Sequence, residues 1–337
     1  MPLRLLFAFF MLIFCATACR SRKKEISFYY WRTTFHLDSL EKETLANNSV
    51  GHLYVRYFDI DFSPADPRPR PIGVIQFDSL PGTIKITPVV YIKNRVFEKL
   101  NIDSLFLFAK NVFGLVRSIN QLKNISCSEM QFDCDWTEKT RDKYFSFLRL
   151  YKKMDGGIIS STIRLHQVKS SDRMGIPPVD YGVLMFYNMG NIDAGLNNSV
   201  YDKSISEKYS PSVKKYPLAL DLALPVFTWA LQMRAGKVIR LLNKMSFTHF
   251  ENDSNFTRLN ENRYLVRRPG FLGGYYFRDQ DSVKVEHVSK EDILSIADQV
   301  NHFSNGRIRN LIFYDLDRRN LTLYEKNIFK EISDYTD

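Results

Sequence analysis

Cysteine is scarce in this chain of 337 residues, and its scarcity limits how the fold can be held together. Of the four cysteines, Cys15 and Cys19 lie in an apolar N-terminal region, which leaves Cys127 and Cys134 in the body of the chain. These two belong to one predicted strand, which separates them by about 23 Å, whereas a disulfide needs Cα atoms within about 7 Å. We therefore expect two buried free thiols, and without cysteines at zinc spacing we expect no zinc site.

Other absences exclude classes of function. No glycine-rich phosphate turn follows the first predicted strand, which argues against a nucleotide-binding Rossmann fold. The formal net charge is +10, yet no long Lys or Arg block and no nucleic-acid motif occurs. We therefore expect no nucleic-acid partner. The sequence also indicates no metal and no organic cofactor, and it contains no internal repeat.

A short apolar run is present at the N-terminus. Arg4 precedes it and the small residues 16–18 follow it, so residues 1–18 are interpreted as a signal peptide. The run is too short for a stable membrane span. Cys19 follows directly, as in bacterial lipoprotein signals, although Ala16 stands where such signals usually have Leu. The pattern predicts lipidation of Cys19, with an ordinary signal peptide cut nearby as the alternative.

A lipid at Cys19 implies a location and a partner. Residues 19–25 would then form a basic tether, and basic runs next to a membrane favour anionic lipid surfaces. We expect a lipid-anchored protein of the bacterial cell envelope, at the outer membrane. The sequence does not distinguish the periplasmic from the surface side.

The remaining residues, 26–337, alternate predicted strands with predicted helices and are expected to form a single domain. Such alternation predicts a parallel sheet, and eight strands in about 300 residues favour a (β/α)8 TIM barrel over an open doubly wound sheet. A proline-rich loop is expected over 63–71, and an inserted antiparallel hairpin over 264–287. The predicted strands are 26–35, 52–62, 83–94, 128–137, 157–167, 181–190, 216–227 and 308–317.

The segment 130–137, MQFDCDWT, alternates apolar and polar residues, as a strand with two different faces does. We predict that Met130, Phe132, Cys134 and Trp136 pack on helices, while Asp133 and Asp135 point into the barrel. Asp135 would be nearest the carboxyl-end rim, where active sites of such barrels lie. Thr137 is predicted to cap the following helix.

Other predicted strands place further polar residues on their inward faces. Several carboxyl groups in one small interior are costly unless they are paired or used, although structural ion networks and helix caps have the same pattern. Aromatic rings that could stack on sugars accompany them, namely Tyr29, Trp31, Tyr187 and Trp229. The inward polar residues are Asp59 and Asp61, Arg164 and His166, Asp221, and Asp315 and Asp317, the last two expected on one face with Phe313.

Carboxyl groups at the mouth of a barrel suit glycoside hydrolysis. One acid must protonate the leaving oxygen, and a second group must attack or stabilise the oxocarbenium-like centre. Neighbouring carboxyl groups help because one raises the pKa of the other. The predicted catalytic residues are Asp133, Asp135 and Asp221, and the predicted substrate-binding residues are Asp59, Asp61, Arg164, His166, Tyr187, Asn188 and Trp229.

Two motifs resemble glycoside hydrolase family 18, the chitinase-like TIM barrels. QFDCDWT resembles the fourth-strand signature of that family, and MFYN at 185–188 resembles its Met-x-Tyr-Asp. FYDLD loosely resembles its last-strand region. The resemblance implies that Asp133 and Asp135 correspond to the two aspartates of the signature. The whole chain also resembles uncharacterised bacterial lipoproteins with a glycoside-hydrolase-like barrel.

The sequence departs from the family pattern at three places. Thr137 stands where the family has its catalytic glutamate, Asn188 replaces the aspartate that polarises the substrate, and no Ser-x-Gly-Gly motif occurs on the third strand. Two functions therefore stay open. The chain is a hydrolase in which Asp135 donates the proton and another inward carboxylate assists, or it is a catalytically inactive accessory lipoprotein that binds a glycan or a protein.

Overall fold

The computed structural model describes residues 24–63, 66–195, 197–304 and 308–336. The predicted signal peptide, Cys19 and most of the basic tether lie outside these residues. No helix within them is both long enough and apolar enough to cross a membrane.

Eight parallel strands close into a barrel, as the sequence predicts, because β1 pairs with both the last strand and the second strand of the ring. Residues such as Phe28, Val90 and Leu222 are fully buried between the strands and the surrounding helices. The barrel strands are β1 (Glu25–Tyr30), β3 (His52–Ser63), β6 (Lys85–Ile92), β7 (Glu129–Asp133), β8 (Ile158–Arg164), β9 (Tyr181–Met185), β10 (Leu220–Pro225) and β18 (Ile308–Tyr314).

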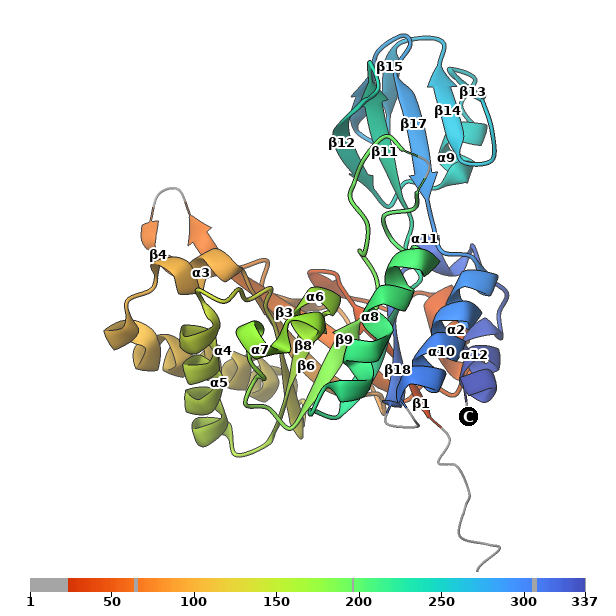
Figure 1. Ribbon diagram of the computed structural model, residues 1–337. Coiled ribbons are helices and arrows are strands. Elements are labelled where there is room, and N and C mark those ends of the chain that lie inside the picture. The colour runs from red at the N-terminus through yellow and green to blue at the C-terminus, as the bar shows by residue number, and fades with distance from the viewer. Residues whose placement is uncertain (1–23, 64–65, 196, 305–307, 337) are drawn as a thin grey trace, which may run out of the picture.

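Helices surround this barrel, and the C-terminus lies at its base (Figure 1). The long helices α4 and α5 are amphipathic, with buried residues at helical spacing on the face toward the strands. The helices are α2 (Ser39–Asn47), α3 (Asn94–Lys99), η1 (Ile102–Ser104), α4 (Leu105–Lys123), α5 (Arg141–Asp155), α6 (Leu165–Lys169), α7 (Ser171–Met174), α8 (Lys203–Lys215), α10 (Lys290–Ser304), α11 (Arg318–Leu321) and α12 (Ile328–Thr336).

Alternate residues of the segment that begins at 130 face opposite sides of the sheet, as predicted. Phe132 packs edge-on against Phe147 of α5 with ring centroids 5.0 Å apart, on the helix side of the sheet. Gln131 lies on the other side, inside the barrel, where it accepts a 2.6 Å hydrogen bond from the Tyr29 hydroxyl. Cys134 is buried and Cys127 is partly buried, and both are free thiols, as expected.

Strands β7 and β8 end earlier than predicted. Strand β7 ends at Asp133, so Asp135 lies in the following loop. Strand β8 ends at Arg164 and α6 begins at the next residue, so His166 is helical. The Gln167 side chain fixes this change of direction, because it accepts from the Arg164 backbone N–H at 2.8 Å.

Two other local predictions are wrong. Helix α5 begins at Arg141 with Thr140, not Thr137, at the N-cap position. The proline-rich segment is not a loop throughout, because β4 (Asp66–Ile72) pairs antiparallel with β3. It is an edge strand, the place in a sheet where proline is tolerated. Two short strands, β2 (Thr34–Phe35) and β5 (Gln76–Phe77), also pair outside the barrel.

The antiparallel insertion is present but larger than the predicted hairpin. It begins at Trp229 rather than near residue 264, and it forms a five-stranded sheet in the order β12-β11-β17-β14-β13 together with the hairpin β15–β16. It has its own apolar core around Phe250 and Tyr264. Its elements are β11 (Trp229–Arg234), β12 (Lys237–Asn243), α9 (Phe247–Glu251), β13 (Phe256–Arg258), β14 (Arg263–Val266), β15 (Gly270–Leu272), β16 (Tyr275–Phe277) and β17 (Ser282–Glu286).

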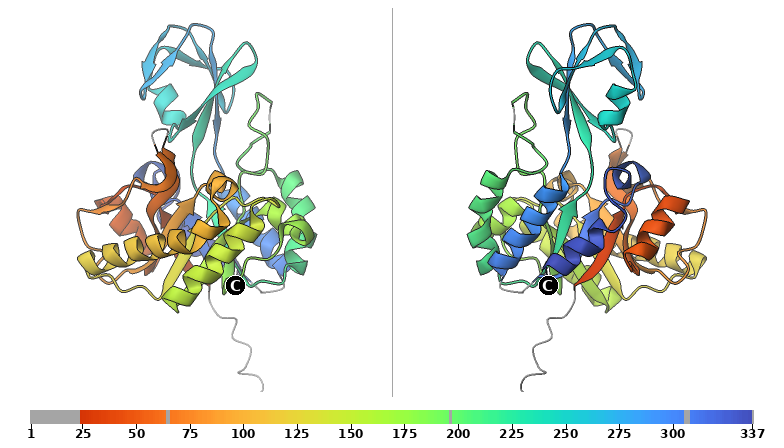
Figure 2. Two further views of the ribbon diagram at one scale, coloured as in Figure 1. Left: turned by 90° about the vertical axis from the view of Figure 1, so that its left-hand side faces the viewer. Right: turned by 90° about the vertical axis from the view of Figure 1, so that its right-hand side faces the viewer.

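The insertion leaves the barrel after β10 and returns to α10. It stands over the end of the barrel that is opposite the C-terminus (Figures 1 and 2). This is the end at which the parallel strands finish, so the insertion forms a wall above the barrel mouth.

Strand packing predicts a specific sensitivity at Gly182 of β9. A Cβ atom there would lie 2.3 Å from Ile163 Cδ1, so Gly182→Ala overpacks the core and should lower the free energy of unfolding by about 1–3 kcal/mol. Ile163→Val removes that Cδ1 atom. The double variant should therefore be more stable than the sum of the single changes predicts, as measured by urea unfolding. Strict additivity would contradict this packing argument.

Candidate functional site

A cavity of about 400 Å³ opens between the barrel mouth and the insertion. Residues at or just after the ends of β7, β8, β9 and β18 line it, together with residues of the insertion and its connection. Its lining consists of Trp31, Asp133, Arg164, Met185, Tyr187, Asn188, Phe227, Thr228, Trp229, Asn243, Lys244, Tyr314, Asp315 and Asn320.

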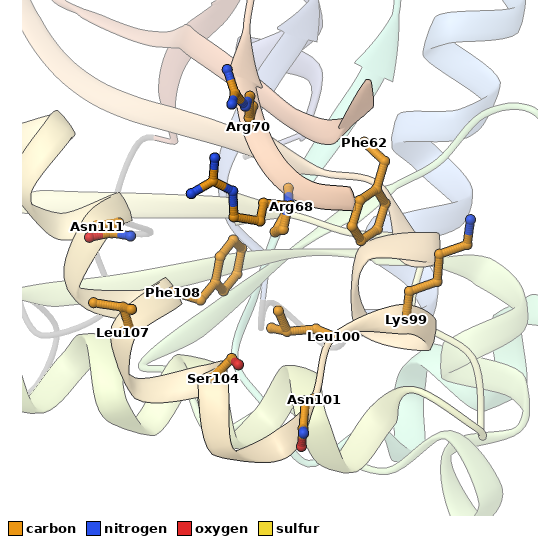
Figure 3. Close-up of a pocket in the computed structure, with 11 residues that line it drawn as sticks. Phe62, Arg68, Arg70, Lys99, Leu100, Asn101, Ser104, Leu107, Phe108 and Asn111 are labelled. Atoms are coloured by element: carbon orange, nitrogen blue, oxygen red, sulfur yellow. The ribbon is translucent and has the colours of Figure 1, made fainter. Parts of the chain in front are cut away.

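A second cavity, of about 500 Å³, lies outside the barrel between β4 and the helices α3 and α4 (Figure 3). Arg68, Arg70 and Lys99 line it alongside the apolar rings of Phe62 and Phe108. No carboxyl group belongs to its lining among the residues that the structure describes, so it offers no pair for acid–base chemistry. The predicted site residues point to the cavity at the barrel mouth instead.

Aromatic rings form much of the wall of the barrel-mouth cavity. The ring centroid of Tyr314 lies 5.6 Å from those of Trp31 and Tyr187 and 5.8 Å from that of Phe227. Phe227 in turn lies 5.2 Å from Trp229. Contacts of this kind hold the rings rigidly, and rigid aromatic faces suit flat apolar surfaces such as those of sugar rings.

Asp133 lies at the end of β7 and points into this cavity. It is in register with Tyr91 and, through Tyr91, with Asp59, so the three residues occupy one level of the inner surface. The Thr162 hydroxyl donates a 2.6 Å hydrogen bond to its carboxyl group. Burial raises the pKa of Asp133 to about 6, although the charge of Arg164 opposes this shift.

Asp135 pairs with Arg164 beside the cavity rather than within its lining. The Arg164 Nε atom lies 2.5 Å from Asp135 Oδ1, and Nη2 lies 3.4 Å from Oδ2. The Asp135 side chain is 44% exposed, against 23% for Arg164. Asp135 thus accepts hydrogen bonds from a guanidinium, while its predicted role as proton donor stays a prediction.

Asp315 is a buried carboxyl group at the end of β18 that lines the cavity. Asn320 donates a 2.6 Å hydrogen bond to it, and burial raises its pKa to about 6 against the opposing charge of Lys244. Lys244 itself pairs with Asp317 at 2.7 Å. The expected shared face with Phe313 is wrong, because the strand ends at Tyr314 and Phe313 packs outward against Phe329.

Five of the ten predicted site residues line this cavity: Asp133, Arg164, Tyr187, Asn188 and Trp229. Asn188 has a positive φ of 56° and is exposed, and its backbone N–H donates to Val200 at 2.8 Å. The Tyr187 hydroxyl donates to Met185 Sδ at 3.0 Å. Tyr187 and Asn188, which follow the end of β9, therefore both line the cavity.

Asp221, a predicted catalytic residue, does not line this cavity. It precedes the end of β10 by four residues and lies in a lower layer of the barrel, where Asn310 donates to it at 3.1 Å and Arg309 lies 4.0 Å away. Glu129, at the beginning of β7, is among the charges that raise its pKa. The alternation correctly predicts that the Asp221 side chain points into the barrel. It does not predict that Asp221 lies below the cavity along the barrel axis.

Asp59, Asp61 and His166 also stand outside the cavity lining. Asp59 pairs with Arg56 at 2.7 Å. Asp61 pairs with Lys93 at 2.6 Å and with Arg95, and these contacts lower the pKa of its carboxyl group. The His166 side chain lies on α6 and is partly accessible to solvent. Loss of part of its hydration lowers the pKa of its imidazole.

Thr137 lies in the turn before α5 rather than in the cavity lining. Its backbone N–H donates to the Thr140 hydroxyl at 2.9 Å, and that hydroxyl donates to Asn94 at 2.6 Å. A threonine cannot supply the proton that a glutamate would supply at this position. In the described part of the chain, no group of three His, Cys, Asp or Glu residues could hold a metal ion.

The structure adds cavity residues that sequence reasoning missed. The sequence gives Trp31 as a possible sugar-stacking ring and Asp315 as an inward carboxyl group without assigning either to the site, and Tyr314 belongs to the FYDLD motif. Asn243 and Lys244 had none, because they come from an insertion whose first strands carry no distinctive pattern. Their place depends on long-range packing of the insertion over the barrel.

Comparison with known proteins places this fold among the chitinase-like barrels. No family model matches the chain, and no curated protein matches it. Among solved structures, the spore cortex-lytic enzyme SleL of Bacillus cereus matches with a TM-score of 0.54 and 13% identity, over 94% of this chain and 75% of that one.

Two plant structures match as well. A family 18 chitinase of Cycas revoluta in complex with (GlcNAc)4 has a TM-score of 0.52 and 12% identity, over 92% of this chain and 99% of that one. The chitinase-like agglutinin RobpsCRA of Robinia pseudoacacia has a TM-score of 0.50 and 10% identity, with the same coverage. The predicted resemblance to family 18 barrels is thus confirmed at the level of the fold.

Asp315 and Asp317, which follow β18, are expected to have opposite effects on how the free energy of unfolding changes with pH. The raised pKa of Asp315 means that the folded state holds a proton that the unfolded state releases between about pH 4 and 6, so this group lowers stability as pH rises through that window. Asp315→Asn should remove this loss, on the order of 2 kcal/mol between pH 4 and 7.

Asp317→Asn is the matched control. The pKa of Asp317 is lowered, despite its burial, by hydrogen bonds from Lys244 and from a backbone N–H, so its stabilising effect persists down to about pH 4 and is lost only below that. The free energy of unfolding of this variant should be lower than that of wild type at neutral pH. Between pH 5 and 7 it should change with pH in the same way as that of wild type. Urea midpoints measured from pH 3.5 to 7 would contradict the assignment if both variants followed the same curve.

Proposed function

We propose that this protein binds a glycan in the barrel-mouth cavity without hydrolysing it. The observation that carries the proposal is the combination of rigid aromatic rings and buried carboxyl groups in the cavity with a threonine at the position of the family's catalytic acid. Hydrogen-bonding groups beside aromatic faces are what a sugar requires. The pairing of Asp135 with Arg164 leaves no exposed carboxyl group free to replace that acid among the described residues of the cavity rim.

The compared structures support a glycan as the ligand. The Cycas revoluta chitinase has (GlcNAc)4 bound, according to its description, and RobpsCRA is described as an agglutinin. The second shows that a barrel of this shape occurs in a protein described by binding. Both are distant relatives in sequence, so the identity of the sugar has to come from experiment.

Hydrolysis is the second candidate, and one observation favours it. Asp133 and Asp315 are buried at the cavity and have pKa values raised to about 6, the property of a general acid that holds a proton near neutral pH. Under this alternative either residue would donate the proton. Asp133→Asn and Asp315→Asn would then abolish turnover, whereas under the binding proposal neither wild type nor variants release product.

Glycan binding predicts a loss of affinity when the aromatic wall is removed. Trp31→Ala should weaken binding of (GlcNAc)4, or of the best soluble cell-wall glycan fragment in a panel, by about tenfold, because stacking contributes about 1–1.5 kcal/mol. Phe271→Ala is the control, since Phe271 is 75% exposed on the insertion and lies outside the cavity lining. Titration calorimetry gives both dissociation constants, and product analysis of the same samples gives turnover.

Three results would count against glycan binding by this cavity. Equal affinity of wild type and Trp31→Ala would place the ligand elsewhere. Glycan cleavage that Asp133→Asn or Asp315→Asn abolishes would replace the binding proposal by the hydrolase alternative. Absence of binding to every glycan in the panel would leave the protein-binding role of an inactive barrel.

We also propose that the protein is a lipid-anchored component of the bacterial cell envelope, at the outer membrane, on the strength of the sequence around Cys19. Wild-type cells grown with an alkyne fatty acid should incorporate label into the protein and retain it in the membrane fraction. Cys19→Ala should lose both properties, while Cys127→Ala keeps both. Wild-type protein that stays unlabelled and soluble would support the ordinary signal peptide instead.

A further inference from the structure

A buried ion pair lies where the insertion meets the barrel. Lys284 and Glu286 stand two residues apart on β17, with Nζ and Oε1 2.7 Å apart and each side chain 1% exposed. Residues two apart on a strand share a face, so both side chains point the same way. Strand β17 pairs with β11, and Glu286 is directly opposite Trp229 in that pairing.

Glu286 connects the pair to the cavity. Its Oε2 atom accepts a 2.8 Å hydrogen bond from Trp229 Nε1, and it also accepts one from the Ser199 hydroxyl. Trp229 lines the cavity and is in contact with Phe227. A tryptophan whose N–H is bound at a fixed acceptor has only one orientation in which both its ring packing and its hydrogen bond are satisfied.

The same pair holds the segment that follows β9. Lys284 Nζ donates to the Asn197 carbonyl at 2.5 Å, and the Asn198 side chain donates to the His287 carbonyl at 2.6 Å. Arg263 of the insertion donates to the Ala194 carbonyl at 2.6 Å. This segment begins next to Asn188, which lines the cavity. The Lys284–Glu286 pair therefore joins the segment after β9 to the insertion, and each of these two parts of the chain contributes residues to the cavity lining.

Stability alone does not account for such a pair. Two buried charges lose their hydration, and an apolar pair of similar size often stabilises a protein as well or better. Here, however, three hydrogen bonds join the pair to two other segments, one to β11 through Trp229 and two to the segment after β9 through Asn197 and Ser199. Apolar residues could fill the same volume but could not fix the Trp229 ring or the segment that carries Ser199.

We propose that Glu286 is a positioning residue of the glycan site, which fixes the Trp229 ring at the cavity and joins the segment after β9 to the insertion. This inference rests on the proposed function. Glu286 touches no glycan itself; it sets affinity through the orientation of Trp229. The interaction that matters is acceptance of the indole N–H by the side chain at position 286.

Two double variants isolate that interaction. Both contain Lys284→Met, which removes the buried cation and its bond to Asn197. One adds Glu286→Gln, whose amide oxygen can still accept from Trp229, and the other adds Glu286→Met, which has a similar volume and cannot. Any effect of losing the ion pair is common to both, so the difference between them reports the hydrogen bonds that the side chain at position 286 accepts from Trp229 and Ser199. The indole N–H signal then reports the bond from Trp229 by itself.

The first readout needs no ligand. The indole N–H signal of Trp229 in nuclear magnetic resonance spectra, assigned by its absence in Trp229→Phe, should keep its position in the Gln variant. It should move upfield and exchange faster with solvent in the Met variant. The second readout is affinity for the best-bound glycan, which should stay within about threefold of wild type for Gln and fall about tenfold or more for Met.

The outcomes separate the two proposals. If wild type binds no glycan, the proposed function fails, while the indole signal still decides whether Glu286 fixes Trp229. If wild type binds and the Gln and Met variants share one affinity and one indole signal, the positioning role is overturned. If the Met variant does not fold, Trp229→Phe replaces it, since it keeps a ring and removes the donor, and wild-type affinity in that variant would equally overturn the role.

Discussion

The electrostatics of the barrel mouth depend on one cation, Arg164. Strand β8 ends at this residue, and Gln167 fixes the turn into α6 so that the guanidinium lies against Asp135 and near Asp133. Arg164 opposes the effect of burial on the pKa of Asp133. Without this cation, two neighbouring carboxyl groups would share a water-poor space with no positive charge to offset their repulsion. The same guanidinium forms the ion pair with Asp135, so one cation offsets the charge of both neighbouring carboxyl groups.

Much of the barrel could be predicted because it follows from local patterns. Alternation in 130–137 gives the correct faces for Phe132 and Gln131, and strand–helix alternation gives the closed parallel barrel. Alternation does not give height along the barrel axis, which depends on where each strand ends relative to its neighbours. Asp221 shows this limit: its face is inward as predicted, but its partner Arg309 lies near the beginning of β18, far below the rim.

The remaining part of the site depends on contacts between segments distant in sequence. Lys244, which directly follows β12 of the insertion, pairs with Asp317, which follows β18. Trp229 of β11 donates a hydrogen bond to Glu286 of β17. No local periodicity encodes such pairs, because each requires the insertion to be folded and placed over the barrel first. Among the lining residues that are not predicted site residues, Asn243 and Lys244 come from the insertion. The barrel and the loops after its strands supply acidic and aromatic groups, and the insertion with its connection adds Phe227, Trp229, Asn243 and Lys244.

Charge compensation inside the cavity bears on the choice between the two candidate functions. Each cation is paired with the more accessible acid of its neighbourhood, Arg164 with Asp135 and Lys244 with Asp317. The two buried acids, Asp133 and Asp315, have their pKa values raised to about 6 by burial and so carry a proton in mildly acidic conditions. A protonated carboxyl group both donates and accepts, which matches sugar hydroxyl groups without adding net charge. Neither acid has an ion-pair partner of its own within the described residues, and burial is the largest influence on their pKa values. Below about pH 6 the proposed site therefore combines neutral hydrogen-bonding groups with aromatic faces.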